Sequence, residues 1–199
     1  WDYSTVDNFG AFHLSRGLSP HWNLAFAFQF GYVRPGPEYR GQEVGYSDAS
    51  SAPLYTSIYQ PTLKLQHRFS PASRISPVLG VGLGATDWKV IDKVGEEVRG
   101  IPTGEAVGGY DTDGNPTTLE GTNFTILLEL GLDVALTDAL TLNLGARYEV
   151  MPGNTKDNVG LSHLWRDPNQ VDANTGLAQA FVGLTWWFGS GDQDGDGVA

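Results

Sequence analysis

The sequence predicts an all-β protein, folded as an antiparallel up-and-down barrel, and three features of the chain predict it. Large apolar residues recur at every second position along several segments, which is the period of a β-strand. Short connections alternate with long ones, as in a meander of antiparallel strands. The 26 glycines and the 12% share of aromatic residues suit strands and tight turns, and no segment has the period and length of a helix.

The first strands are expected at 8–18, 22–32 and 55–69. Segment 8–18 gives the weakest pattern, in which Phe12 and Leu14 mark the apolar face. In 22–32 every even position is a large apolar residue, and the odd positions carry only Asn, Ala, Gln and Gly. In 55–69 the apolar face opposes Gln, Thr, Lys and Arg. Each segment therefore has one apolar face and one small or polar face.

Four further strands complete the pattern. In 75–84 Leu and Val alternate with glycine, and 123–136 is the longest alternating segment of the chain. Segments 140–150 and 180–188 follow with the same period. Single-chain bacterial barrels have an even number of strands, and these seven are one short. An eighth strand is therefore expected, formed in part by 1–6 or lying upstream of the sequence.

The connections predict that the two ends of the barrel differ. Short turns are expected at 19–21, 70–74 and 137–139. Long polar loops are expected near 34–54, 89–121 and 152–175. Short turns at one end and long loops at the other are typical of bacterial outer-membrane barrels.

Alternation alone leaves two possible directions for the apolar face. A soluble barrel that carries lipophilic ligands has this face inside, whereas a membrane barrel has it outside, against lipid. The apolar faces here are almost free of charge over about 9–11 residues, the length that a tilted strand needs to cross a bilayer. Aromatic residues such as Trp22, Tyr148 and Trp186 lie at the ends of those faces, where amphipathic rings meet lipid headgroups. We therefore expect a transmembrane β-barrel in 1–189, followed by an acidic linker at 190–199.

Composition excludes several classes of function. The net charge of −11 argues against a nucleic-acid partner, because phosphate binding needs a basic surface. The chain has no cysteine, so it has neither disulfides nor thiolate metal sites. No run approaches the roughly 18–20 apolar residues of a membrane helix. The chain opens on Trp1 without a signal segment, and we expect a processed or truncated chain.

Six charged residues fall on the face expected to line the interior. Eight strands enclose a space that side chains just fill, and charges there must pair or meet trapped water. We interpret the six as a structural ion-pair network that blocks passage, with a gated narrow pore or a catalytic cluster as the alternatives. They are Lys64, Arg68, Glu129, Asp133, Arg147 and Glu149.

No catalytic set stands out in the sequence, and we expect that the protein is not an enzyme. His21 and His67 lie at or next to short turns, which suggests an interfacial position. Ser162 and His163 lie in a long loop without an identifiable partner.

Three carboxylates alternate with other residues near the end of the chain. Asp192, Asp194 and Asp196 precede Gly197 and match the first six positions of a D-x-D-x-D-G calcium loop. Calcium takes about six to eight oxygen ligands, so the site is incomplete, and a flexible acidic linker is the alternative. The segment 111–116 looks similar, but Pro116 replaces the required glycine, and we expect a plain turn there.

Three sequence segments resemble those of the outer membrane protein A family of small barrels: LSPHWNLAFAFQFGY, LTDALTLNLGARYEV and FVGLTWWFG. The following DQDGDGV resembles the start of a thrombospondin type 3 repeat. The resemblance implies a barrel in the outer membrane of a Gram-negative bacterium, joined by a periplasmic linker to a peptidoglycan-binding domain. It also implies that Asp192, Asp194 and Asp196 are calcium ligands in the complete protein. The missing eighth strand and the absent downstream domain depart from the family.

The leading hypothesis is a structural outer-membrane barrel that anchors the cell envelope, contacts membrane lipid and lipopolysaccharide, and displays long loops outside. One alternative is a narrow, porin-like channel for solutes or ions. The other is a surface-recognition or adhesion module that binds a protein partner through its loops. Apart from calcium at the tail, no cofactor is expected.

Overall fold

The computed structural model describes residues 9–33, 55–91, 108–110, 116–118, 120–152 and 175–188. Within these ranges all regular structure is β-strand, and no helix is long and apolar enough to cross a membrane. The strands are β1 (Phe9–Gly17), β2 (Trp22–Val33), β3 (Tyr55–Arg68), β4 (Ile75–Ile91), β5 (Gly108–Tyr110), β6 (Pro116–Thr118), β7 (Glu120–Ala135), β8 (Leu140–Met151) and β9 (Thr175–Trp186).

Seven of the strands form one antiparallel sheet in the order β1-β2-β3-β4-β7-β8-β9. Each of these strands pairs with the one that precedes it in the sheet, so the chain runs up and down as a meander. The predicted all-β, up-and-down architecture is confirmed, with all seven strands read from the sequence. The predicted eighth strand is not among the described residues, which exclude 1–6, and β1 and β9 are the two edges of the described sheet.

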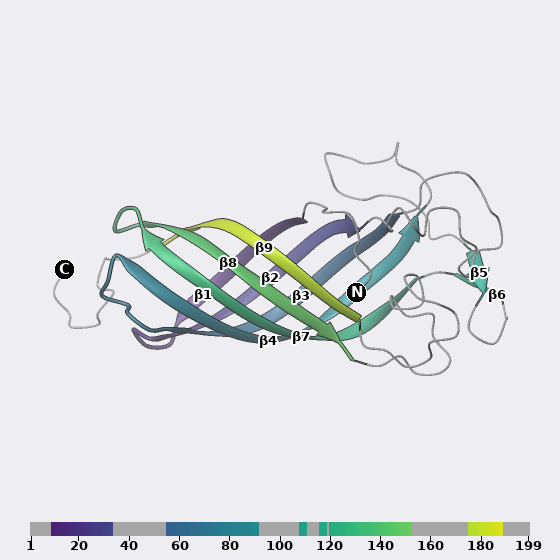
Figure 1. Ribbon diagram of the computed structural model, residues 1–199, viewed down its shortest axis with the longest axis horizontal. Coiled ribbons are helices and arrows are strands. Elements are labelled where there is room, and N and C mark those ends of the chain that lie inside the picture. The colour runs from purple at the N-terminus through teal and green to yellow at the C-terminus, as the bar shows by residue number, and fades with distance from the viewer. Residues whose placement is uncertain are drawn as a thin grey trace.

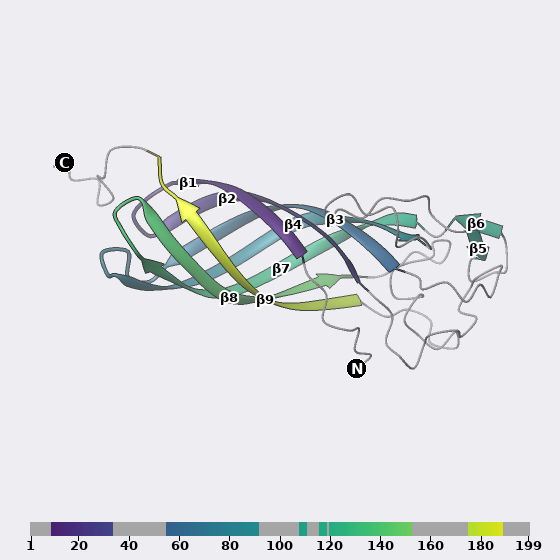
Figure 2. The same ribbon diagram turned by 90° about the horizontal axis from the view of Figure 1, so that it is seen from above.

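The sheet curls round on itself (Figures 1 and 2). Side chains from strands that are not neighbours in the sheet meet across its interior. Arg147 Nη1 on β8 donates a hydrogen bond to Gln29 Oε1 on β2 at 2.9 Å. Thr185 Oγ1 on β9 lies 3.2 Å from His13 Nε2 on β1, although no backbone ladder joins these two edge strands in the described sheet. The curl therefore brings the first and last described strands within side-chain contact.

The two ends of the barrel differ, as predicted. The three short turns, 18–21, 69–74 and 136–139, lie together at one end, here called the turn end. The small β5–β6 hairpin lies beyond the opposite end, here called the loop end (Figure 1).

Several boundaries differ from the sequence prediction, and β9 begins at Thr175, five residues before the predicted start at 180. Strand β4 continues to Ile91, past the alternation seen up to Gly84 and into the long loop predicted from residue 89, and the β5–β6 hairpin lies within that same predicted loop. The reason is that the pattern reverses past Gly84: Trp88 points inward and is buried, whereas the neighbouring Asp87 is exposed. Because an apolar residue lies on the polar face and a charged residue lies on the apolar face, the alternation no longer indicates a strand in this segment.

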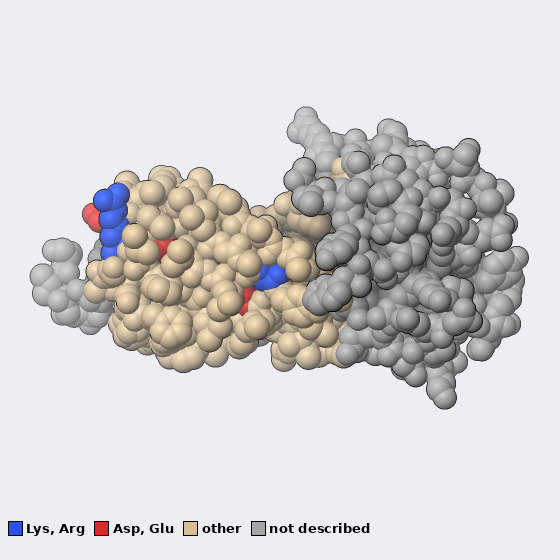
Figure 3. Space-filling model, viewed as in Figure 1, with Lys and Arg blue, Asp and Glu red and all other residues tan. Residues whose placement is uncertain are grey.

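The apolar face of the sheet points outward. On β7, Leu128 is 47% exposed and Leu130 is 60% exposed, whereas Glu129 between them is 3% exposed. On β1, Phe12 and Leu14 are exposed, which confirms the face predicted for this weak strand. In Figure 3 the described wall of the barrel is almost free of Lys, Arg, Asp and Glu. The sheet therefore exposes its large apolar side chains and buries its charges.

The described residues carry six Lys or Arg and six Asp or Glu. Their charges balance, so the whole net charge of −11 falls on the remaining residues of the chain. The acidity of the protein is therefore a property of its connections and ends, and the barrel wall and interior are neutral as a unit.

A close backbone approach requires glycine at position 145 on β8. A Cβ there would lie 2.5 Å from the carbonyl oxygen of Leu130 and 2.6 Å from Cζ of Phe181. Gly183 also faces inward, but a Cβ there would meet nothing closer than 3.8 Å. We expect Gly145→Ala to destabilise the barrel by about 1–3 kcal/mol through overpacking. Gly183→Ala should change stability by less than about 0.5 kcal/mol. Urea unfolding in lipid vesicles measures both, and equal effects would contradict the packing described.

Candidate functional site: the barrel interior

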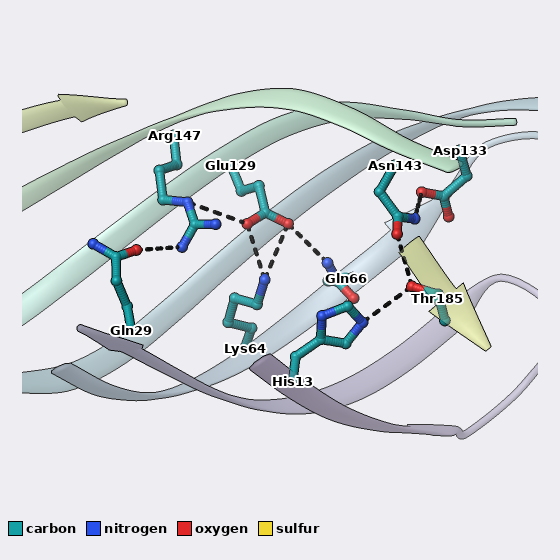
Figure 4. A network of polar contacts seen from close by, with 9 residues as sticks. All are labelled: His13, Gln29, Lys64, Gln66, Glu129, Asp133, Asn143, Arg147 and Thr185. Atoms are coloured by element: carbon teal, nitrogen blue, oxygen red, sulfur yellow. Dashed lines mark hydrogen bonds and ion pairs between the residues drawn. The ribbon is translucent and has the colours of Figure 1, made fainter. Parts of the chain in front are cut away.

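Glu129 on β7 is the centre of the polar interior. Its carboxylate accepts hydrogen bonds from Lys64 Nζ on β3, at 2.9 Å to Oε2 and 3.2 Å to Oε1. Gln66 Nε2, also on β3, donates to Oε1 at 2.8 Å. Lys64 and Glu129 are almost completely buried, so this is an ion pair shielded from water. Figure 4 shows the donors converging on this one carboxylate.

Arg147 on β8 joins the centre from the other side. Its Nε lies 4.0 Å from Glu129 Oε2, and its guanidinium lies 4.8 Å from the centroid of the Phe181 ring. The ring face attracts the cation and covers it. With the hydrogen bond to Gln29, these contacts extend the network across the whole interior (Figure 4).

A second group of polar side chains lies towards the turn end. Arg68 Nη2 pairs with Asp133 Oδ2 at 2.8 Å, and its guanidinium lies 4.6 Å from the centroid of the Trp187 ring. Asn143 Nδ2 donates to Asp133 Oδ1 at 2.7 Å, and Thr185 Oγ1 donates to Asn143 Oδ1 at 2.7 Å. This group therefore joins β3, β7, β8 and β9 around the interior.

Glu149 is the one predicted interior charge for which no ion pair appears in the described part of the chain. Its side chain is fully buried, and both carboxylate oxygens lack a hydrogen-bond partner among the described protein groups. Gln60 Oε1 and Gln179 Nε2 are also buried without such a partner. Because buried polar atoms in proteins are usually satisfied, trapped water is the expected partner of these groups. The structure thus brings five of the six predicted charges into close contact and leaves Glu149 apart.

The narrow spacing of the network depends on glycines that face it from β4. A Cβ at Gly82 would lie 3.1 Å from Lys64 Cγ, and a Cβ at Gly80 would lie 3.2 Å from Glu129 Cβ. Larger residues at these positions would push against the ion pair. The alternation of glycine with Leu and Val in the sequence therefore has a structural reason: the glycines provide the space that the ion pair fills.

Large apolar side chains also point inward, and sequence reasoning missed them. Ile58, Trp88, Leu127 and Met151 are all buried on the inward face, Leu127 near the middle of β7 and the other three towards the loop end of their strands. Each interrupts a face that otherwise carries polar or small residues, so periodicity gave no signal for them. Their inward positions could have been found only by counting every second residue along each strand, and for Trp88 and Met151 by continuing that count beyond the alternating segment. Their packing adds an apolar region to the interior beyond the ion pairs.

Of the other candidate residues, the structure describes His21 and His67. His21 and His67 lie at the turn end, near the barrel surface, with ring centroids 5.7 Å apart. Ser162, His163 and the tail carboxylates Asp192, Asp194 and Asp196 lie outside the described residues, as does 111–115. No group of three or more His, Asp or Glu within the described ranges is arranged to hold a metal ion. The interior is suited to mutual neutralisation of charge.

The fold, but not the sequence, has a known counterpart. No protein-family model and no curated protein matches the sequence. The crystal structure of neisserial surface protein A (NspA) matches with a TM-score of 0.52 at 15% sequence identity, covering 92% of this chain and 84% of that chain. At this identity the likeness shows the fold: an antiparallel up-and-down sheet with the architecture of an outer-membrane β-barrel.

Proposed function

We propose that this protein is a β-barrel of the bacterial outer membrane with a sealed interior, which has a structural role in the cell envelope and displays its long loops at the cell surface. The observation that carries this proposal is the division of the sheet. Its outward face exposes large apolar side chains, and its inward face buries paired charges. Exposed apolar surface of this extent is unfavourable in water and favourable against hydrocarbon.

The contents of the interior argue against a soluble lipophile carrier. Such a barrel needs an apolar cavity for its ligand. Here Lys64, Glu129, Arg68 and Asp133 occupy the interior as ion pairs, and Phe12, Leu14 and Leu128 face outward. A lipophilic ligand would have to displace charges that are already paired, at a high cost in free energy.

The aromatic residues support a membrane position. Trp22, Phe69 and Trp186 lie on the outward face towards the turn end, and Tyr148 lies on the outward face nearer the loop end. Aromatic side chains gather at both interfaces of membrane barrels. In such barrels the short turns face the periplasm and the longer loops face outward, so we place the turn end in the periplasm.

A sealed barrel should not conduct ions. The Lys64–Glu129 and Arg68–Asp133 pairs cross the interior, and apolar side chains such as Leu127 fill it nearer the loop end. We expect the purified protein in a planar lipid bilayer to show no steady conductance above that of the bare membrane. Reproducible open-channel steps of one size would contradict the sealed barrel and favour the alternative of a narrow solute or ion channel.

One observation favours a second role, recognition or adhesion through the loops. The described residues are neutral as a unit, so the net charge of −11 lies in the connections and ends of the chain. Charged loops held on a rigid barrel are suited to binding a protein partner. Pull-down of partners with the whole protein and with shortened loops would test this role, and identical partners from both would count against it.

The periplasmic linker remains a proposal from the sequence. The chain leaves β9 at the turn end, where Trp187 N donates to the carbonyl oxygen of Ala139 at 2.9 Å. Asp192, Asp194 and Asp196 follow shortly after in the sequence, which suits a linker on the periplasmic side. Calcium titration of the complete protein would test whether these residues bind the ion. Attachment to peptidoglycan depends on a domain beyond this sequence.

A further inference from the structure

We propose that a patch on the outward face at the turn end binds the phosphate group of an anionic glycerophospholipid. The patch, here called the rim patch, consists of Arg16, His21, Trp22, His67 and Phe69. It lies on β1, β2, β3 and the turns that follow β1 and β3. The proposal rests on the membrane position proposed above and goes beyond it by assigning a lipid site.

The backbone register places the rim patch on one continuous surface. Arg16 lies opposite Leu24 in the β1–β2 ladder, and Trp22 is the next outward residue along β2. Trp22 in turn lies opposite His67 in the β2–β3 ladder. Cross-strand and diagonal neighbours on one face of a sheet are close enough for long side chains to meet. A single lipid headgroup can therefore reach the side chains of all three strands.

The rings of the patch hold one another in place. The His67 ring lies 4.6 Å from the Trp22 ring, 4.8 Å from the Phe69 ring and 5.7 Å from the His21 ring, measured between centroids. His21 Nδ1 donates to the carbonyl oxygen of Arg68 at 2.9 Å, which fixes the outer ring of the group. Trp22 and Phe69 remain exposed on the outward side. The rings thus form an aromatic platform, which suits the depth where acyl chains meet headgroups.

Arg16 and Trp22 supply donors that the protein does not use itself within its described part. Trp88 and Trp187 direct their indole N–H groups to Asn123 and Thr141 inside the barrel. By contrast, no hydrogen bond between described residues engages the Trp22 indole N–H, and no described carboxylate pairs with the exposed Arg16. A guanidinium and an indole N–H at diagonal positions of neighbouring strands offer charge and a directed donor to a phosphate oxygen.

Charge near the rim patch favours an anion. The outward and turn positions of β1, β2 and β3 in the described structure carry two cations, Arg16 and Arg74, and no carboxylate. Asp138 lies in the turn between β7 and β8, on another part of the rim. A cation beside aromatic residues at the edge of an apolar wall complements a headgroup whose acyl chains lie along that wall. This combination favours a lipid phosphate over a free anion.

The test measures lipid binding to the complete protein in maltoside micelles by native mass spectrometry. The probes are phosphatidylglycerol, diacylglycerol with the same chains, and inorganic phosphate. We expect phosphatidylglycerol to bind more tightly than diacylglycerol, and inorganic phosphate not to displace it. Arg16→Gln should weaken phosphatidylglycerol binding about fivefold. Trp22→Phe, which keeps a ring and removes the N–H, should weaken it by about two- to tenfold.

Arg74→Gln is the matched control. Arg74 lies in the turn between β3 and β4 at the same end, but its Nε donates to the carbonyl oxygen of Ala135 at 3.3 Å. This variant should bind phosphatidylglycerol as the wild type does. Three results would each overturn the rim patch as a lipid site. They are an equal loss of phosphatidylglycerol affinity in Arg16→Gln and Arg74→Gln, binding of diacylglycerol as tight as that of phosphatidylglycerol, and displacement of phosphatidylglycerol by inorganic phosphate. A protein that is freely soluble without detergent would overturn the membrane position as well, so the two failures are distinguishable.

Discussion

Replacement of Glu129 by glutamine is expected to destabilise the folded barrel by about 3–5 kcal/mol. The amide keeps the size of the side chain but removes the negative charge that Lys64 Nζ contacts at 2.9 Å and Arg147 Nε approaches at 4.0 Å. Two buried cations then lack their common counter-charge, and removing one partner of a buried pair leaves the other with its full desolvation cost. Urea unfolding of the protein in lipid vesicles, followed by tryptophan fluorescence, measures the change.

A second substitution separates loss of the ion pair from general damage. Lys64→Met removes the main cation that Glu129 neutralises. The double variant Lys64→Met with Glu129→Gln should therefore lose markedly less unfolding free energy than the two single variants lose in sum. Glu120→Gln removes a carboxylate from an exposed position on the same strand and should change stability by less than about 0.5 kcal/mol. Strict additivity of Lys64→Met and Glu129→Gln would contradict the paired interior.

Leu128→Arg is expected to destabilise the inserted barrel by about 2–4 kcal/mol, because it places a charge on the outward face near the middle of β7. The cost arises from bringing a guanidinium into hydrocarbon, and it falls towards the interfaces. Unfolding from lipid vesicles by urea, compared with the wild-type protein, measures it.

The same substitution at the turn end provides the matched control. Leu136 is the same residue type and is as exposed as Leu128, but it lies in the turn after β7. An arginine there can reach the headgroups, so Leu136→Arg should cost about 0–1 kcal/mol. Equal costs at the two positions would show that the outward face does not contact hydrocarbon.

Periodicity predicted the strands and their faces because it reports a local property of the chain. Successive side chains in a strand point to opposite faces, so the alternation in 22–32 or 123–136 shows which residues share a face before any partner is known. The prediction was least exact at the ends of strands, at the end of β4 and at the start of β9. Beyond Gly84, the inward Trp88 and the exposed Asp87 reversed the two faces, and the end of β4 was missed.

The interior charges were predicted as a set but not as pairs. The alternation of side chains along each strand was enough to predict that Lys64 and Glu129 lie on the inward face. Their contact joins β3 to β7, strands that are separated in the sheet by β4. It depends on the curl of the sheet and on the space left by Gly80 and Gly82, and neither is a local property of the sequence. Glu149 lies on the same inward face, yet within the described part of the chain its carboxylate forms no ion pair.

The sequence by itself determined that this chain is a meander of strands with one apolar and one polar face, since the two-residue period is set by backbone geometry alone. The tertiary structure alone decided which inward side chains meet and how completely the interior is filled. It also decided that the rings of Trp22, His67 and Phe69 form one platform at the turn end. The physical reason is that such contacts form between residues far apart in the chain, and strand register and sheet curl set their distances.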